Sequence, residues 1–249
     1  MHESDDLVLN NNFIALAITL VIALLRLRIN DYFAHKGWVT SKTSRKIIHI
    51  GTGPIFVLCW MLFNSSLFAP TIAALVPLGI TLQFALVGSG VINDPSAVEA
   101  MSRTGDRKEI LKGPLFYGLV FVILTIVFWR NSAVGIVALM ILCGGDALAD
   151  IIGNHVDVYK LPWSPKKTLA GSMTVLIGGF VFACLMVWVF ISQGYLDLTL
   201  SETILPILFI ALISAFIESL PLENIDNISI PLVSDIIGMI VFWISGVMF

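Results

Sequence analysis

Positive charge in this 249-residue sequence is confined almost entirely to three stretches, and long apolar runs separate these stretches. Thirteen of the fourteen Lys and Arg residues fall within 26–46, 103–112 and 160–167. The other gaps between apolar runs hold a single basic residue, Arg130. Because Lys and Arg collect in the loops on the inner side of a membrane, this alternation predicts a membrane protein whose three basic loops share one face.

The apolar runs are long enough to cross a bilayer. Hydrophobic residues make up 57% of the chain and charged residues 12%, and the mean hydropathy is +0.95, which is far from a soluble domain. A spanning helix needs about 20 apolar residues. Eight runs approach that length: 11–27, 47–63, 70–91, 114–129, 133–152, 172–192, 203–218 and 230–249. We predict an all-α polytopic protein with about eight (seven to nine) transmembrane helices, forming a single membrane domain over residues 1–249.

The same charge pattern predicts the orientation. The basic stretch after the first run places that loop in the cytoplasm and the N-terminus outside. Residues 1–6 are acidic, without the basic start of a secretory signal or the Arg- and Ser-rich character of a transit peptide. We therefore expect a bacterial or cyanobacterial cell membrane (or a thylakoid membrane), with the catalytic loops facing the cytoplasm.

Segment 144–154 (GGDALADIIGN) carries the strongest chemical signal. Asp146 and Asp150 lie four residues apart, on one face of a helix. Two like charges at this spacing repel, and a bound Mg²⁺ resolves the repulsion because it typically takes one or two carboxylates together with phosphate oxygens. Gly145 permits a phosphate to approach the backbone closely. The alternative is a solvated helix end with two ordinary acids.

A shaped loop follows at residues 160–172 (KLPWSPKKTLAGS). Its two prolines exclude a continuous helix through 162–165. Lys166 and Lys167 precede the expected start of the sixth span, where a helix N-terminus and positive side chains together form an anion site. Ser172 can add a hydroxyl. The alternative is a basic cluster that binds lipid headgroups.

Two other loops supply further candidates. Arg107 and Lys112 lie in the second basic loop, which is either part of the phosphate site or an interfacial helix held by salt bridges. Glu218 and Asp226 bracket an acidic loop that can provide cation ligands or a base.

The start of the second span adds a third polar group. Lys46 and His49 are three residues apart, and Arg45 and His49 are four apart, so these side chains can share one helical face. A lone histidine at a membrane rim is usually only interfacial, and with basic neighbours on the same helical face a functional role is the alternative.

In combination these motifs resemble the polyprenol and phytol kinase family. This family includes dolichol kinases and CTP-dependent diacylglycerol kinases, and it is related to phosphatidate cytidylyltransferases. The resemblance lies in Arg45-Lys46-x-x-His49, Gly145-Asp146-x-x-Ala149-Asp150-x-x-Gly153 and Lys167-Thr168-x-x-Gly171-Ser172. Segment 105–117 (GDRKEILKGPLFY) and segment 218–221 (ESLP), with Asp226-Asn227 and Pro231 after it, are similar to the phytol kinase branch. The resemblance covers about residues 44–232.

The resemblance implies a kinase that transfers a phosphoryl group from a nucleoside triphosphate, with CTP favoured, to the hydroxyl of a membrane isoprenoid alcohol such as phytol, farnesol or geranylgeraniol. It implies Mg²⁺ as the cofactor, with metal ligands Asp146, Asp150 and Glu218. It implies that the nucleotide and its phosphates are bound by Gly145, Lys166, Lys167, Thr168, Gly171, Ser172, Arg107 and Lys112. The catalytic candidates are Asp146, Asp150, Lys46, His49 and Asp226, and one of the three aspartates is expected to accept the proton of the alcohol.

The expected partners are the nucleotide, the alcohol and membrane lipids, without nucleic acid, and the sequence does not indicate a homodimer. Two enzymatic alternatives are a CTP-dependent lipid cytidylyltransferase and a diacylglycerol kinase. A transporter or a lipid-binding membrane protein is the non-enzymatic alternative, but Asp146 and Asp150 lie at the end of a span rather than at the bilayer midplane that transporters use. The sequence lacks GxxxxGK[ST], GxGxxG and HExxH, so the P-loop, dinucleotide-binding and zinc-protease classes are excluded.

Overall fold

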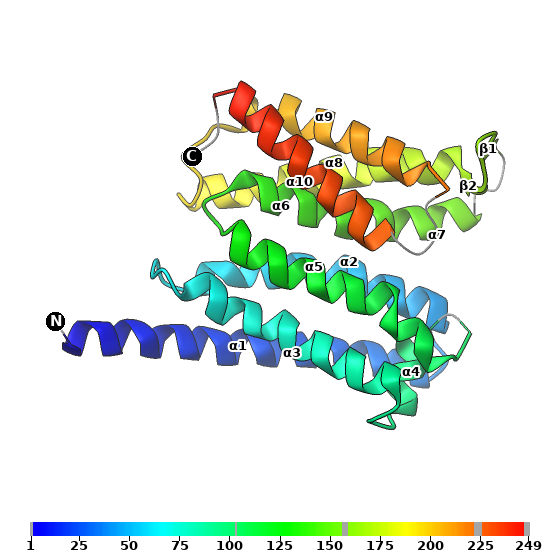
Figure 1. The fold of residues 1–249 in the computed structure, drawn as a ribbon, viewed down its shortest axis with the longest axis horizontal. Coiled ribbons are helices and arrows are strands. Elements are labelled where there is room, and N and C mark those ends of the chain that lie inside the picture. Colours follow the sequence, from blue (N-terminus) through cyan, green and yellow to red (C-terminus); the bar gives the residue numbers. More distant parts are fainter. Residues whose placement is uncertain (1, 103, 156–158, 222–225, 247–249) are drawn as a thin grey trace. The chain divides into compact units, whose positions relative to one another are not determined.

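A computed structural model describes the chain except for residues 1, 103, 156–158, 222–225 and 247–249. The side chains of residues 2–10, 41–42, 150, 154–155 and 226 also lie outside the described part. The described chain is built from helices and one two-stranded hairpin (Figure 1), which confirms the predicted all-α membrane class. It forms two compact units, residues 1–129 and 130–249. The single membrane domain stays a prediction.

Unit 1 is a group of long helices with short connections. Its elements are α1 (His2–His35), α2 (Ser41–Cys59), η1 (Trp60–Leu62), α3 (Ala69–Ser89), α4 (Pro95–Met101), η2 (Arg107–Leu111) and α5 (Gly113–Val127). Local sequence explains several of the helix ends. The Thr40 hydroxyl caps α2 by accepting from the Thr43 N–H, and Gly90 ends α3 at a positive φ of 85°, a conformation that glycine adopts without steric cost.

Helices α3 and α5 pack closely in the centre of unit 1. A Cβ atom on Gly118 of α5 would overlap the hydroxyl of Thr81 on α3, so only glycine fits at this crossing. The core nearby contains Ile48, Phe84 and Ile110.

Unit 2 surrounds one fully buried helix. Its elements are α6 (Ala133–Met140), η3 (Ile141–Asp146), α7 (Ala147–His155), β1 (Lys160–Leu161), β2 (Ser164–Thr168), α8 (Leu169–Ser192), α9 (Leu200–Glu218) and α10 (Asp226–Ile244). Every residue from Ala133 to Ala147 is buried, because α8 and α10 cover α6 and η3. Strands β1 and β2 pair antiparallel where two prolines exclude a helix.

Seven helices in the described part of the chain are long and apolar enough to span a membrane, within the predicted range of seven to nine. They are Asn11–His35, Ala69–Ser89, Arg107–Val127, Ala133–Gly153, Leu169–Ser192, Leu200–Glu218 and Asn227–Ile244. Helix α2 covers most of the remaining predicted run, 47–63, but its first turns are polar and basic. The predicted orientation of the termini stays a prediction.

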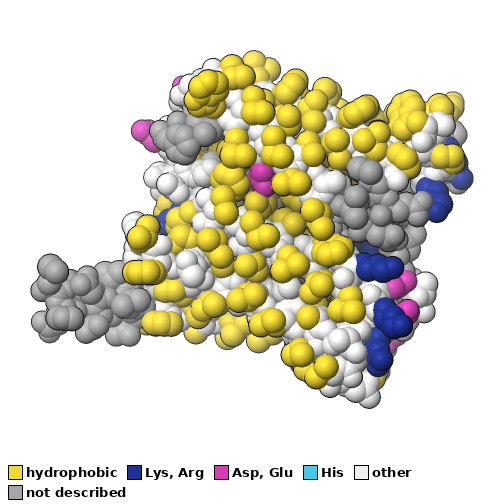
Figure 2. All heavy atoms as spheres, in the orientation of Figure 1, with side chains coloured by type: hydrophobic (Ala, Val, Ile, Leu, Met, Phe, Trp, Pro, Cys, Tyr) yellow, Lys and Arg dark blue, Asp and Glu magenta, His cyan; other side chains and the backbone are white. Residues whose placement is uncertain are grey.

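The outer faces of the helices are suited to lipid. Figure 2 shows hydrophobic side chains spread over the exposed helices, with Lys and Arg gathered at one end of the helices in each unit. Exposed large apolar residues occur along α1, α3, α5, α8, α9 and α10. Apolar surface of this extent is stable in a bilayer and not in water.

Candidate functional site

Asp146 lies at the end of the buried helix of unit 2. It is the last residue of η3, a π-helical segment that joins α6 to α7, and its side chain is 8% exposed. Such segments are rare and often occur at functional sites. A carboxylate at the end of an apolar buried helix is costly unless a cation or hydrogen bonds compensate it. The position therefore suits a group that binds a cation.

Glycines hold this segment against α8. A Cβ atom on Gly178 would lie 2.5 Å from the Gly144 carbonyl oxygen, and one on Gly145 would lie 3.1 Å from the Val175 carbonyl oxygen. The absence of a side chain at Gly145 thus allows the α8 backbone to approach closely, where the sequence analysis expected a phosphate. Gly178 and Gly179 belong to a closed contact of α8 with η3.

Contacts at glycines also join α7 to the start of α8. The Thr168 hydroxyl caps α8 by accepting from the Gly171 N–H at 3.1 Å. A Cβ atom on Gly153 would lie 2.9 Å from that hydroxyl oxygen, and one on Gly171 would lie 3.7 Å from the Ala149 carbonyl oxygen. Since Gly145 meets Val175 and Ala149 meets Gly171, Asp146 lies level with the first two turns of α8.

A cluster of charged and hydroxyl groups closes the same end of unit 2. Lys167 Nζ donates to Glu218 Oε1 at 2.9 Å, and Ser172 Oγ donates to Glu218 Oε2 at 2.8 Å. Glu218 is 5% exposed. The structure therefore joins three of the predicted site residues, from β2, α8 and the end of α9. In this arrangement Lys167 neutralises Glu218, and both carboxylate oxygens of Glu218 already accept hydrogen bonds.

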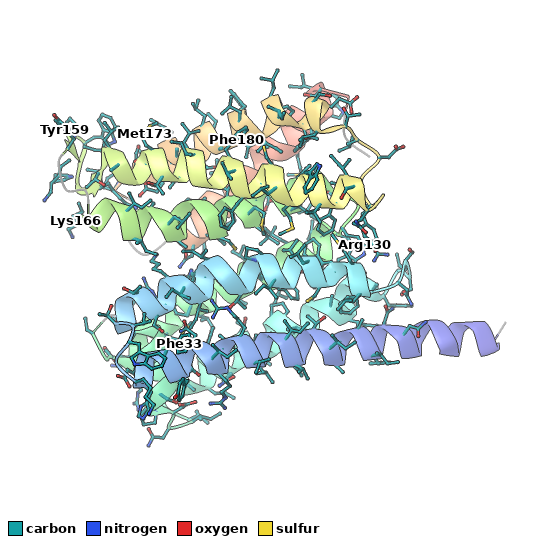
Figure 3. All side chains as sticks on the ribbon, turned by 180° about the vertical axis from the view of Figure 1, so that it is seen from behind. Phe33, Arg130, Tyr159, Lys166, Met173 and Phe180 are labelled. Atoms are coloured by element: carbon teal, nitrogen blue, oxygen red, sulfur yellow. The ribbon has the colours of Figure 1, made fainter. Side chains whose placement is uncertain are left out.

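The β1–β2 hairpin presents further basic groups beside this cluster. Lys160 and Lys166 are exposed, and Lys166 lies with Tyr159 at the end of unit 2 where α8 begins (Figure 3). Trp163 anchors the hairpin by donating from Nε1 to the Ser219 carbonyl oxygen at 3.2 Å. The hairpin thus places an exposed lysine next to a helix N-terminus, the arrangement that binds anions.

The remaining predicted residues lie in unit 1. Arg45, Lys46 and His49 are all buried on α2. The His49 ring lies 4.1 Å from the ring of Tyr117, and the Tyr117 hydroxyl donates to the His49 carbonyl oxygen at 3.0 Å.

Arg107 and Lys112 are exposed residues at the two ends of the short η2 segment. The Arg107 guanidinium lies against Gly90, where a Cβ atom would meet it at 2.5 Å. An interfacial helix was one of the two alternatives for this loop, and the helical segment observed in it, Arg107–Leu111, has five residues.

Two predicted carboxylates, Asp150 and Asp226, have side chains outside the described residues, and their backbones lie in α7 and at the start of α10. Over the described part of the chain no group of three His, Cys, Asp or Glu side chains could hold a metal by itself. A cation shared with phosphate oxygens needs only one or two carboxylates. The Asp146 side chain and the helical spacing of Asp150 fit such a cation. Glu218 accepts hydrogen bonds from Lys167 and Ser172, and its role as a metal ligand stays a prediction.

Asp235 is a notable residue that the sequence analysis missed. It lies on α10 within the span Asn227–Ile244, is 5% exposed, and its Oδ1 has no hydrogen-bond partner among the described residues. The neighbouring Ser234 hydroxyl lies 2.8 Å from that of Ser214. An acid inside an apolar run was the available signal, since such residues are costly and usually have a purpose.

Comparison with known proteins identifies relatives of the whole chain. No protein-family profile matches, and no solved structure matches. The chain is 37% identical over 230 residues to probable phytol kinase 3, chloroplastic, of Glycine max, covering 91% of this chain and 72% of the relative. It is 36% identical over 228 residues to probable phytol kinase 2, chloroplastic, of Oryza sativa subsp. japonica, covering 91% and 75%. It is 36% identical over 230 residues to farnesol kinase, chloroplastic, of Arabidopsis thaliana, covering 92% and 75%.

These relatives correct the predicted location. Each is described as chloroplastic and comes from a plant, which points to a chloroplast membrane and contradicts the bacterial or cyanobacterial cell membrane with a cytoplasmic active face. The error arose from the first six residues. The aligned regions cover only about three quarters of the relatives, so the start of the sequence given does not decide the compartment.

Proposed function

The chain belongs to the phytol kinase family and is a membrane kinase that phosphorylates the hydroxyl of an isoprenoid alcohol, and we propose that it uses phytol as acceptor, CTP as donor and Mg²⁺ as metal. Relatives of this kind indicate a nucleotide substrate and a divalent metal requirement. The choice of phytol is supported by the descriptions of the relatives, the choice of Mg²⁺ by the acidic motif around Asp146, and the choice of CTP by the resemblance to the polyprenol and phytol kinase family. We further propose a chloroplast membrane as its location.

Asp146 carries the proposal for the metal and the triphosphate. Its carboxylate is buried level with the first two turns of α8, and Asp150 follows one helical turn later. We assign these two residues to the cation, which neutralises phosphate charge when bound. We assign the phosphates to the α8 N-terminus with Lys166, Thr168 and Gly171, because the helix dipole and the exposed lysine attract anions. The Leu169 and Gly171 N–H groups already donate to the Tyr159 carbonyl oxygen and the Thr168 hydroxyl.

Lys167 and Ser172 were expected at the phosphates, and we propose that they also position the helices around the phosphate site. Both bind Glu218, so they fix the end of α9 against the start of α8. A phosphoryl transfer site depends on positioning and charge neutralisation, and this cluster supplies the positioning. In unit 1, we propose that Lys46, Arg107 and Lys112 contribute positive charge to the same reaction.

The alcohol must also lose a proton. We propose that one carboxylate, with Asp146, Asp150 and Asp226 as the candidates, accepts it. His49, buried on α2 beside Tyr117, is proposed to contact the alcohol.

The test is a phosphoryl-transfer assay on purified protein with Mg²⁺. CTP, UTP and ATP are each combined with phytol, farnesol, a long polyprenol and diacylglycerol, and both lipid and nucleotide products are measured. We expect phytyl phosphate and CDP to be the main products. Release of pyrophosphate with a lipid phosphate acceptor would instead identify a nucleotidyl transferase.

A matched pair of variants tests the assignment of Asp146. Asp146→Asn is expected to reduce kcat at least about 100-fold, because loss of an electrostatic group at the reacting phosphate costs about 3 kcal/mol. Asp197→Asn, an exposed acid of the same unit, is expected to keep full activity. A folded Asp146→Asn variant with normal turnover would refute the site.

A further inference from the structure

Unit 1 contains a cavity that phosphate binding does not use. It lies between α1, α2, α3 and α5, and its cavity volume is about 50 Å³. Its walls are mainly apolar, with Ala23, Ile80, Phe84 and Phe121 among the lining residues. Since about 10–15 Å³ holds one water molecule, this space admits the head of a small ligand and not a whole lipid chain.

One polar group in the cavity wall is unusual. The Thr52 hydroxyl is buried and has no hydrogen-bond partner within the part of the chain that the structure describes. Other helical threonines of unit 1 donate to the carbonyl oxygen four residues earlier: Thr19 at 2.7 Å, Thr81 at 2.6 Å and Thr125 at 2.6 Å. A buried hydroxyl without a partner costs free energy, so Thr52 is suited to a ligand that supplies one.

The cavity changes character along α2. Its wall runs from His49 past Thr52 to Phe56, a length of about 10 Å along the helix. Arg45 and Lys46 are buried in the helical turn before His49. The wall is apolar along almost its whole length, but its His49 end lies one helical turn from two basic residues and contains the Thr52 hydroxyl, while its Phe56 end is aromatic. This gradient matches an amphiphile with a small polar head and a branched hydrocarbon chain.

We propose that this cavity binds the hydroxyl-bearing end of the isoprenoid alcohol, with Thr52 Oγ1 as a hydrogen-bond partner of the substrate hydroxyl. The inference rests on the proposed function and names the place of its lipid substrate. The chain beyond the first isoprene units lies outside the cavity, along the lipid-facing helices. The close contacts of Gly178 and Gly179 leave no such space at those positions in unit 2.

Substitution of Thr52 tests the polar contact. Thr52→Val keeps the shape and removes the hydroxyl, so we expect KM for phytol to rise about three- to tenfold, with kcat little changed. Thr52→Ser is expected to restore the KM. Because the hydroxyl has no protein partner among the described residues, Thr52→Val should unfold at the same temperature or a higher one. Equal KM values for the wild type and both variants would overturn the assignment of Thr52.

Filling the cavity tests the apolar contact. Ala23→Phe places an aromatic ring inside it, and the matched control Ala17→Phe changes an exposed alanine on the same helix. We expect KM for phytol to rise about tenfold or more only for Ala23→Phe. Should Ala23→Phe fail to fold, Phe84→Ala enlarges the cavity and is expected to alter the ratio of kcat/KM for phytol and farnesol. An unchanged ratio would contradict the inference.

Photolabelling tests binding without turnover. A farnesol analogue with a photoreactive group near its hydroxyl is bound to the nucleotide-free protein and irradiated, and the labelled peptides are identified by mass spectrometry. We expect adducts on α2, α3 and α5 that phytol prevents and phosphatidylglycerol does not. Equal protection by both would show a bilayer lipid site and overturn the inference. If the wild type labels in this way but phosphorylates no alcohol, the proposed function fails and the cavity assignment stands.

Discussion

The ion pair between Lys167 and Glu218 ties the hairpin to α9, and its effect can be measured at the level of single residues. The two side chains are 18% and 7% exposed, so removal of either partner leaves a mostly buried charge. We expect Lys167→Met and Glu218→Gln each to lower the free energy of unfolding by about 1–3 kcal/mol. The double variant should lose less than the sum. A double-mutant cycle checks this, and effects that add within about 0.5 kcal/mol would show that the pair is not coupled.

Replacement of Asp235, unlike that of Lys167 or Glu218, is predicted to raise the free energy of unfolding. Its buried carboxylate has an oxygen without a partner in the described structure, and replacing such a group with an apolar one of similar shape is neutral or stabilising. We expect Asp235→Leu to raise the free energy of unfolding by about 1–3 kcal/mol, whereas Asp235→Asn, which keeps a polar group, should not. Thermal unfolding in detergent measures both, and a less stable Asp235→Leu variant would indicate an interaction that the carboxylate needs.

The packing of α8 against η3 is the element-scale feature that positions Asp146. A Cβ atom on Gly178 would press on the Gly144 backbone at 2.5 Å, so the two elements must separate. We expect Gly178→Ala to destabilise the protein by about 1–3 kcal/mol and to lower kcat. Gly79→Ala is the control, since the described residues leave open space around this helical glycine. There alanine should stabilise α3 by up to about 1 kcal/mol. Equal responses would refute the role of the contact.

Sequence patterns were sufficient to predict the spanning helices but not the contacts between them. Apolar length determines a spanning helix almost by itself, and the prolines at 162 and 165 excluded a helix where the hairpin forms. The partners of Glu218 are 46 and 51 residues away in the chain, so only packing reveals them. The π-helical turn before Asp146 is buried under α8 and α10, and the sequence analysis did not predict it.

For the molecule as a whole, the distribution of charge predicts how each unit sits in the membrane. In unit 2 the lysines of the hairpin lie at one end, whereas Arg130 lies at the other end (Figure 3). The Arg130 guanidinium stacks on Tyr195 at 4.6 Å. Arg130, the one basic residue outside the three basic stretches, is therefore buried against the Tyr195 ring. We propose that all three basic loops face one side of the membrane and that the N-terminus faces the other.

Cysteine accessibility in sealed membrane vesicles tests this topology. Single cysteines replace exposed residues in four connections, Trp38, Leu67, Tyr159 and Asp197, after the native cysteines have been changed to serine: Cys59, Cys143 and Cys184. A membrane-impermeant maleimide should label Trp38→Cys and Tyr159→Cys from one side, and Leu67→Cys and Asp197→Cys from the other, because basic loops are retained on a single side. Labelling of Trp38→Cys and Leu67→Cys from the same side would mean that α2 does not cross the bilayer. The basic loop 26–46 would then face the side opposite to the basic loops 103–112 and 160–167, and Lys46 could not act with Asp146.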